Sequence, residues 1–421
     1  MSPCYRSANI LLPDFKKVDA MRWALIACDQ FTSEPEYWED AARIVGDAPS
    51  TLRLFLPEAQ LEEAEARIPV IQATMKEYLS DILCEHPDAM IYVERTQSDG
   101  SIRHGLVLAV DLECYDYHKG ASSLIRATEA TVLERIPPRV AIRRGADVEL
   151  PHVMLLIDDP ANTVLGALAK GTGEVAYDTE LMKKGGHITG RYLAKSEQKE
   201  VGQALDALIT PEAMTARYAD ASLSPLLFAV GDGNHSLASA KAAYEEIKAA
   251  IGTEAAKGHP ARYALAEVVN IHDDALKFEP IYRVVFGVNP EDLLIALRAY
   301  AENLGGNAQP QAVTYCYGKE EGAITFQKPV LQLTVGTLQN FLDEYLSTHA
   351  GASVDYIHGE GSVRQLAAKP NAVGFLFDGM EKSDLFRTVL YDGALPRKTF
   401  SMGHAEDKRY YLECRRITLA D

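Results

Sequence analysis

The sequence predicts a mixed α/β (α+β) fold, and three features support this class. Asp99-Gly100 lies between two apolar, β-rich runs, the strongest short signal for an antiparallel hairpin. Thr210-Pro211 supplies a cap residue followed by a proline at the first helical position, which is typical of a helix start. An apolar run at 226–230 is followed at once by residues with helical periodicity. Strands and helices should therefore alternate along the chain.

In the first part of the chain we expect one long helix and then the hairpin. Residues 58–83 follow Pro57 and begin with acidic side chains, as helices often do. Pro69 lies inside this segment and is expected to kink or split the helix. The hairpin strands are predicted at 90–96 and 102–113.

The character of the sequence changes near residue 121. We predict a helix at 122–136, a proline-bounded connector at 137–151 and a short buried strand at 152–159. A helix at 196–208 precedes the one that starts at Pro211. The strand–turn–helix of 226–251 completes this part.

After this segment, residues 263–271 and 280–286 are expected to form buried strands. Pro290 is expected to begin a helix, and the remaining sequence is typical of a smaller α/β domain. With 421 residues, the chain is long enough for two or three domains. We predict an N-terminal region at 1–120, a core at 121–290 and a C-terminal domain at 291–421.

Composition limits the kinds of function. Hydrophobic residues make up 47% and charged residues 24% of the chain, which are ordinary values for a globular protein. The formal net charge of −18 repels phosphate backbones and anionic lipids, so we expect neither nucleic acid nor a membrane as partner. A locally positive pocket for one small anion remains compatible with this charge.

Cysteine spacing indicates reduced thiols. The six cysteines form no CxxC pair, so a zinc site or disulfide framework is not predicted, and each is expected to be a small buried side chain. The chain starts without a basic segment followed by an apolar one, and it has no long apolar run. We therefore expect a cytoplasmic protein; the oligomeric state stays open.

The turn at 231–236, Gly-Asp-Gly-Asn-His-Ser, carries the most chemistry. Backbone N–H groups and the positive end of a helix dipole meet where a strand passes into a helix, and this favours anion binding. Gly231 and Gly233 allow a ligand to approach the backbone, and Asn234 and Ser236 complete the predicted phosphate-binding set. Asp232 is a candidate Mg²⁺ ligand and catalytic residue. His235 is a candidate for phosphate contact or proton transfer.

A purely structural interpretation of this turn is also open. Asp-Gly-Asn is common in turns, and Asn or Ser before a helix is a common cap. The turn is neither a Walker loop nor a Rossmann turn, because neither glycine spacing is present.

Several motifs in one order resemble the domain-of-unknown-function family 1015 along nearly the whole chain. They are RATEAT from Arg126, the PHVMLL strand, the Asp232-Gly233-Asn234-His235 turn, VVNIHDDALKFEPIYRVVF, IHG around His358, and LPRKTFSMG near the C-terminus. The family turn looks like the phosphate-binding turn of the ParB/sulfiredoxin-like fold. The resemblance therefore implies a ParB/sulfiredoxin-like core with additional α/β regions.

That fold includes free-serine kinases. The resemblance thus implies a nucleotide-dependent phosphotransferase that uses Mg²⁺ with ATP or ADP and acts on a small hydroxy amino acid such as serine. A sulfiredoxin-like redox role is disfavoured, because it needs a thiol at the turn and no cysteine lies between Cys114 and Cys316.

The turn departs from the commoner family pattern in one respect. Asn234-His235-Ser236 stands where His-His-Arg is usual, so the arginine that would neutralise phosphate charge is missing. Tyr282 similarly replaces an expected histidine. The substrate site is therefore expected to draw its cations from elsewhere. The candidate substrate-binding residues are Arg126, Arg283, His358, Arg397 and Lys398.

Glu129 is the candidate general base, because transfer to a hydroxyl requires a carboxylate near the attacking oxygen. Arg126 precedes it by one turn of the predicted helix and could pair with it there, although a plain surface ion pair fits the same spacing. His152 precedes a buried strand and is expected to be structural. The acidic pairs Asp158-Asp159 and Asp273-Asp274 lie at strand ends and rank below Asp232 as Mg²⁺ ligands.

Two other functions remain alternatives. A phosphoserine-using phosphohydrolase would use the same turn without nucleotide. A non-catalytic, nucleotide-gated interaction protein would bind nucleotide without turnover.

Overall fold

The computed structural model describes residues 3–129 and 136–419. The described chain forms two units, and segments from both ends of the sequence belong to the first. Unit 1 comprises Met1–Ala127, Thr131–Leu276 and His404–Asp421, and unit 2 comprises Thr128–Ala130 and Lys277–Gly403. Both units combine sheets with helices, so the predicted mixed α/β class is confirmed. The domain boundaries predicted from the sequence, at 120/121 and 290/291, refer to parts that fold independently, and they stay a prediction.

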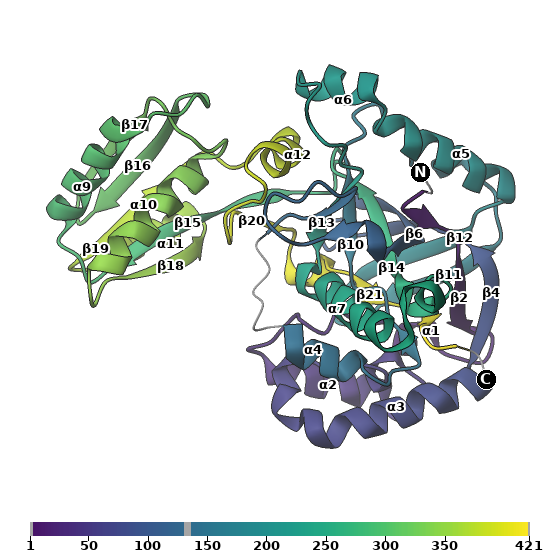
Figure 1. Cartoon of the computed structure of the whole chain (residues 1–421). Helices are drawn as coiled ribbons and strands as arrows, with labels where there is room; N and C mark the ends of the chain where they lie inside the picture. The colour runs from purple at the N-terminus through teal and green to yellow at the C-terminus, as the bar shows by residue number, and fades with distance from the viewer. Residues whose placement is uncertain (1–2, 130–135, 420–421) are drawn as a thin grey trace. The chain divides into compact units, whose positions relative to one another are not determined.

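Unit 1 is built on a large mixed sheet (Figure 1). Its strands follow the order β11 (Val175–Leu181), β12 (Gly186–Tyr192), β5 (Ile91–Thr96), β6 (Ile102–Asp111), β14 (Tyr263–Asn270), β10 (Met154–Ile157), β13 (Phe228–Asp232), β8 (Ile125–Ala127) and β7 (Tyr115–Asp116), with β1 (Tyr5–Arg6) also paired to β6. Three short pairs accompany it: β2 (Ala8–Pro13) with β4 (Leu83–Ala89), β3 (Leu25–Ile26) with β21 (Tyr410–Tyr411), and β9 (Val148–Glu149) with β22 (Arg415–Arg416).

Helices surround this sheet. They are α1 (Ala20–Trp23), α2 (Pro35–Val45), α3 (Ala64–Asp81), α4 (Ile136–Arg143), α5 (Lys195–Leu208), α6 (Pro211–Tyr218), α7 (Asn234–Ile251) and α8 (Thr253–Ala256). Helix α4 packs along α7, with Val140 against Ala238 and Ala243 (Figure 1). Among the helices of the described ranges, none is both long enough and apolar enough to cross a lipid bilayer.

The hairpin and the helix starts are confirmed. Strands β5 and β6 pair antiparallel around a turn in which Gly100 has a φ of 84°. The hydroxyl of Thr210 accepts a hydrogen bond of 3.2 Å from the backbone N–H of Ala213 at the start of α6. The predicted strand–turn–helix is β13 followed by α7, with Gly233 between them.

Two expectations for the first half of the chain were wrong. Residues Ile125–Ala127 form strand β8 instead of a helix, because their backbone pairs in parallel with β13. The connector expected at 137–151 begins as helix α4. Helix α3 runs through Pro69 without being split, and the kink expected as the other effect of this proline stays a prediction.

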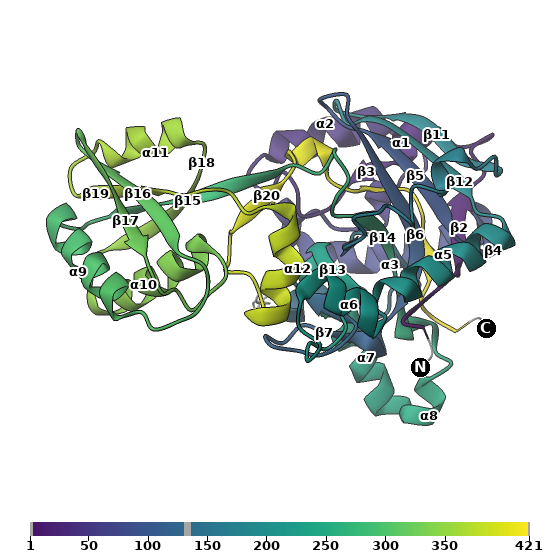
Figure 2. The ribbon, with the colours of Figure 1, turned by 90° about the horizontal axis from the view of Figure 1, so that it is seen from above.

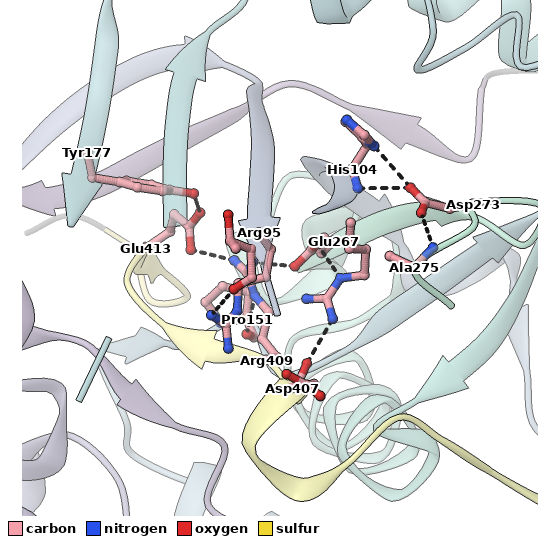
Figure 3. A network of polar contacts seen from close by, with 12 residues as sticks. Arg95, His104, Pro151, Tyr177, Glu267, Asp273, Ala275, Asp407, Arg409 and Glu413 are labelled. Atoms are coloured by element: carbon pink, nitrogen blue, oxygen red, sulfur yellow. Dashed lines mark hydrogen bonds and ion pairs between the residues drawn. The ribbon is translucent and has the colours of Figure 1, made fainter. Parts of the chain in front are cut away.

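A buried ionic network ties the C-terminal segment to the sheet (Figure 3). Arg409 is 1% exposed and pairs with Glu267 of β14 and, at 2.5 Å, with Glu413, which accepts a 2.6 Å hydrogen bond from the Tyr177 hydroxyl. Burial alone would raise the pKa of Glu267, but Arg409 and Arg103 outweigh it and lower the pKa. The network therefore keeps the Glu267 carboxylate ionised inside the core.

Unit 2 has a sheet in the order β17 (Glu320–Phe326), β16 (Gln311–Tyr317), β19 (Ala372–Leu376), β15 (Phe278–Phe286) and β18 (Ser353–His358), with β20 (Phe400–Met402) also paired to β15. Its helices are α9 (Pro290–Asn303), α10 (Thr334–Thr348), α11 (Glu360–Ala367) and α12 (Lys382–Tyr391). Helices α9 and α10 lie on one face of the sheet and α11 on the other (Figure 2). The predicted helix start at Pro290 is confirmed, with Asn289 as its cap.

Candidate functional site

The turn between β13 and α7 depends on Gly233. This residue is the N-cap of α7 and has φ 80° and ψ 27°, in the left-handed region that other residues adopt only with strain. A Cβ atom there would lie 3.0 Å from Cδ2 of His152 and 3.1 Å from the Cα of Val153. Both the backbone conformation and the neighbouring chain therefore require glycine.

Strand pairing explains why residue 152 lies beside this turn. Strands β10 and β13 are antiparallel, and Met154 is opposite Asp232. Residues that immediately precede β10 consequently lie next to residues that follow β13. No local sequence pattern indicates that His152 and the turn lie together.

The first turn of α7 is only partly covered. Residues 231–236 are all half-buried, and Gly233 at the N-cap position has no side chain with which to cap the helix. The helix dipole therefore presents its positive end at a partly accessible position.

Asp232 has a partner for each of its carboxylate oxygens. Oδ1 accepts a 2.9 Å hydrogen bond from the backbone N–H of Gly233, and Oδ2 lies 3.2 Å from Nζ of Lys408. Nδ2 of Asn234 donates to the carbonyl oxygen of Val230 at 3.4 Å, a side-chain-to-backbone hydrogen bond within the turn. The carbonyl of His235 accepts from the Ser239 hydroxyl at 2.7 Å. Lys408 is thus a cation at the turn, although the turn itself lacks an arginine.

His152 is the centre of a polar cluster next to the turn. Its Nε2 lies 3.1 Å from Oδ2 of Asp29, and its Nδ1 lies 2.8 Å from the Tyr411 hydroxyl and 3.9 Å from Sγ of Cys28. Burial disfavours the charged imidazole, but the Asp29 carboxylate outweighs burial and raises the pKa of His152 well above its usual range. Burial also acts against the Asp29 carboxylate, yet His152 lowers its pKa. The pair is therefore held as imidazolium and carboxylate.

A cavity of about 150 Å³ adjoins both the cluster and the first turn of α7. Cys28, His152, Tyr411, Ser236 and Ser239 line one part of it, and apolar side chains such as Leu54, Phe55, Leu56, Met75, Ile142 and Leu150 line the rest. Two arginines of α4 also face it. Arg139 pairs with Glu58 and Arg143 with Glu149. The cavity is therefore apolar in most of its wall, with a polar side at the helix N-terminus.

Arg126 and Arg283 hold backbone segments. Arg126 is 4% exposed and donates to the carbonyls of Ser123, Ser224 and Pro225 at 2.8 to 3.1 Å. Because Arg126 lies in strand β8, the helical spacing expected between Arg126 and Glu129 was wrong. Arg283 has no exposed surface and donates to the side chain of Gln339 and to backbone carbonyls including those of Arg397 and Lys398. Burial lowers the pKa of both guanidinium groups to about 10. Their roles in substrate binding stay predictions.

The remaining predicted residues belong to unit 2. Glu129 is half-buried and forms an isolated bridge with Leu395. His358 ends β18 and is exposed. Arg397 and Lys398 are exposed, and Arg397 lies 3.2 Å from Asp343. Their predicted roles remain untested by the geometry within unit 2.

Metal-ligand clusters do not appear in the described ranges: no group of three or more His, Cys, Asp or Glu side chains there is arranged to hold a metal ion. A single carboxylate such as Asp232 is still a usual protein ligand for Mg²⁺. The ion keeps several waters and takes most of its other ligands from substrate phosphates.

The cysteine expectation was wrong for three residues. Cys4, Cys316 and Cys414 are buried as predicted, but Cys84 is exposed and Cys28 and Cys114 are half-buried.

Two residues beside the turn were not predicted from the sequence. Neither Cys28 nor Lys408 is close to the turn in sequence, and no local pattern marks either one. Only the pairing of β3 with β21 brings Cys28 and Tyr411 together.

Taken together, the fold and the turn define a mixed α/β protein with a half-exposed helix N-terminus beside a cavity. The chain belongs to the family described as protein of unknown function (DUF1015), which matches residues 12–348. The family resemblance noted in the sequence is thereby confirmed. No curated protein matches the sequence.

Solved structures show distant likeness. A free serine kinase mutant in complex with ADP has 11% identity and a TM-score of 0.36, with 74% of this chain and 92% of that chain covered. SbnI with a C-terminal truncation from Staphylococcus aureus has 11% identity and a TM-score of 0.34, covering 74% and 87%. A conserved hypothetical protein from Pyrococcus furiosus has 9% identity and a TM-score of 0.35, covering 74% and 95%. Likeness at this level does not define an activity.

Proposed function

We propose that the protein is a cytoplasmic, nucleotide-dependent phosphotransferase that acts on a small hydroxy amino acid, with a ParB/sulfiredoxin-like phosphate turn at 231–236. The single observation that supports this most is the start of α7. Gly233 takes the N-cap position and contributes no capping side chain, and the turn is half-exposed beside a cavity. Such a helix start favours a phosphate group over any neutral ligand.

Cations near the turn support the same ligand. The protein has a net charge of −18, so an anionic nucleotide needs local positive charge to approach. Lys408 lies beside Asp232, and Arg139 and Arg143 line the adjoining cavity. We propose that Lys408 takes over the charge-neutralising role of the missing arginine in the turn.

Asp232 is the proposed holder of Mg²⁺ that arrives with ATP or ADP. A bound Mg²⁺ would neutralise charge that develops on the transferring phosphoryl group. For this the Oδ2 atom must exchange its contact with Lys408 for the metal, which frees Lys408 to contact a phosphate oxygen. This single exchange of partners at Asp232 would bring both positive charges, Mg²⁺ and the Lys408 ammonium group, to the phosphates.

Proton transfer needs a base near the acceptor hydroxyl. Glu129 and His235 remain the proposed catalytic residues for this step. In unit 1, the imidazole of His152 is a further group that can hold a proton beside the turn, because Asp29 fixes its orientation. The amino group and carboxylate of the acceptor are expected to contact charged side chains, for which Arg126, Arg283, His358, Arg397 and Lys398 are the predicted set.

Phosphoryl transfer can be followed directly by ³¹P NMR. Purified protein is incubated with Mg²⁺, with ATP or ADP, and with serine, threonine or homoserine as acceptor. We expect an O-phospho amino acid, and at least about 100-fold slower formation in Asp232→Asn, since the proposed ligand of Mg²⁺ is removed. Asp81→Asn, at an exposed acid of the same unit, is the matched control.

The outcome can also contradict the proposal. Release of inorganic phosphate from phosphoserine without nucleotide would indicate the phosphohydrolase instead. Tight nucleotide binding in calorimetry with no product over hours would indicate a nucleotide-gated interaction protein.

A further inference from the structure

We propose that Cys28 is a nucleophilic thiolate, stabilised by the imidazolium of His152 whose charge Asp29 holds, and that the adjoining cavity takes the acyl group of a small activated acyl donor. The donor class is an ester or thioester of a short apolar acid. The inference does not rest on the phosphoryl transfer proposed above, because it uses neither nucleotide nor Asp232.

The three side chains are brought together by two separate pairings. Strand β3 ends at Ile26 and pairs with β21, so Cys28 and Asp29 follow directly beside Tyr411. The antiparallel pairing of β10 and β13 places His152 at the same end of the sheet. Sγ of Cys28 lies 3.9 Å from Nδ1 of His152, and Oδ2 of Asp29 lies 3.1 Å from Nε2.

Asp29 determines which ring nitrogen meets the thiol. A carboxylate accepts a hydrogen bond only from a protonated nitrogen, so the contact with Asp29 places a proton on Nε2. In the imidazolium Nδ1 also carries a proton, and it faces Cys28 and the Tyr411 hydroxyl. A Cys28 thiolate beside this imidazolium is the ion pair that activates cysteine nucleophiles.

Tyr411 joins the thiol to the imidazole. Its hydroxyl lies 2.8 Å from Nδ1 and accepts a 3.2 Å hydrogen bond from the backbone N–H of Cys28. Burial raises the pKa of Tyr411 well above its usual range, so the phenol stays neutral and can pass a proton between the two groups. Lys408 also acts on Asp29 and favours its carboxylate, and the paired side chains Arg139–Glu58 and Arg143–Glu149 line the same cavity.

Cys28 differs from the buried cysteines of the protein. Burial raises the pKa of Cys4, Cys316 and Cys414, as expected for inert thiols in the core. Cys28 is half-buried and lines the cavity. Among the cysteines, all of which lie in the described ranges, Cys28 combines access to a cavity with contact to a histidine.

The wall of the cavity indicates the kind of electrophile. Its volume is about 150 Å³, and an apolar cavity of this size can hold a benzene molecule. Leu54, Phe55, Leu56, Met75, Ile142 and Leu150 contribute the apolar part. Ser236, in the first turn of α7, lies on the same cavity as Cys28, so a carbonyl oxygen that becomes negative would be near a helix N-terminus. The apolar wall of the cavity therefore suits the acyl chain of the donor, and its polar side suits the carbonyl group.

The reaction balances within these residues and the donor. The thiolate sulfur attacks the carbonyl carbon, a C–S bond forms, and the bond from that carbon to the donor's oxygen or sulfur breaks. The departing alcohol or thiol takes a proton from Nδ1 of the His152 imidazolium. The products are S-acyl Cys28, neutral His152 and the free alcohol or thiol. Water, deprotonated by the neutral imidazole, then releases the carboxylic acid and restores the thiolate and the imidazolium.

The test uses the full-length protein and p-nitrophenyl butyrate, without nucleotide. We expect rapid release of p-nitrophenolate in an amount equal to the protein, and a butyryl mass increment on the peptide that contains Cys28. Cys28→Ser should remove both signals, whereas Cys84→Ser, at an exposed cysteine, should keep them. His152→Gln and Asp29→Asn should slow acylation, and circular dichroism verifies that each variant is folded.

Iodoacetamide labelling provides a readout that is independent of the ester. At pH 6 we expect Cys28 to react at least about tenfold faster than Cys84, because a thiolate is the reactive form, and we expect His152→Gln to remove the difference. Equal labelling rates for Cys28 and Cys84 in the folded protein, or butyryl groups distributed over other residues with Cys28 unmodified, would overturn the proposal.

Discussion

The carboxylate of Asp232 and the ammonium group of Lys408 lie 3.2 Å apart, and they join the turn before α7 to the C-terminal segment of the chain. Both side chains are largely covered, with 22% and 16% of their surface exposed. The turn therefore has a basic neighbour that its own sequence lacks. This pairing makes the proposed phosphate site depend on residues from two distant parts of the chain.

Replacing Lys408 by methionine should weaken nucleotide binding more than it affects folding. The pair is partly covered, so its loss should change the free energy of unfolding by only about 1 kcal/mol. Calorimetry should show at least about fivefold weaker ATP binding, because one cation at the phosphates is lost. Lys257→Met removes an exposed pair with Glu254 and is the control. Equal ATP affinity in Lys408→Met and wild type would exclude this role of Lys408.

Gly233→Ala should destabilise the protein by about 2 to 3 kcal/mol in urea unfolding. The φ of 80° accounts for part of this cost, and the new Cβ would also be only 3.0 Å from His152. Gly252→Ala is a matched control, because its φ is 87° and no heavy atom lies within 4 Å of its Cβ position. The difference between the two variants isolates the crowding at the turn. Identical losses would mean that His152 moves aside without cost.

The pair of His152 and Asp29 should contribute stability in a defined pH range. The pKa of His152 is raised on folding, so its contribution is complete below the unfolded value of about 6.5 and decreases as the pH rises through the folded value. The pKa of Asp29 is lowered, so its contribution is present above about 3.9 and is lost as the pH falls through the folded value. The pair therefore stabilises most between about pH 4 and 6.5.

Asp29→Asn tests this range. Urea unfolding at several pH values should show the largest loss, about 1.5 to 3 kcal/mol, between about pH 4 and 6.5, and a smaller loss above it. Asp116→Asn breaks an exposed contact with His118 and should have little effect at any pH. A loss for Asp29→Asn that does not vary with pH would contradict the ionised pair.

Glu267→Gln should be among the most damaging substitutions in unit 1. The carboxylate pairs with Arg409 and lies 3.6 Å from Nε of Arg103, and its removal leaves buried positive charge without compensation. We expect a loss of about 3 to 5 kcal/mol in urea unfolding. Glu254→Gln, at an exposed residue, should cost less than about 1 kcal/mol. A comparably small effect of Glu267→Gln would show that the network carries little net charge–charge stabilisation.

Arg283→Lys separates a structural role from substrate binding. The guanidinium of Arg283 donates to Gln339 and to the carbonyls of Arg397 and Lys398, and a lysine cannot make all of these bonds. We expect a loss of about 2 to 4 kcal/mol in the unfolding of unit 2. Arg397→Ala, at an exposed residue, should leave stability nearly unchanged. A raised KM for the amino acid in a stably folded Arg283→Lys would instead support the predicted substrate contact.

Local patterns were sufficient for much of the fold. The Asp99-Gly100 hairpin, the Thr210 cap and the strand–turn–helix at 226–251 were predicted because each depends on residues adjacent in sequence. The segment at 125–127 was misjudged as helix. Its residues do not alternate clearly, and pairing with β13 determines its conformation. The helical spacing expected between Arg126 and Glu129 rested on the same error, whereas the partners of Arg126 are the carbonyls of distant residues.

The sequence by itself determined that a glycine-rich turn joins a buried strand to a helix, because glycine permits the left-handed backbone that this turn requires at Gly233. Only the tertiary structure decided which side chains accompany the turn. His152 is there because β10 is antiparallel to β13, and Cys28 and Tyr411 meet because β3 pairs with β21. Pairing between strands far apart in the chain is set by the packing of the whole core, which no local pattern of residues records.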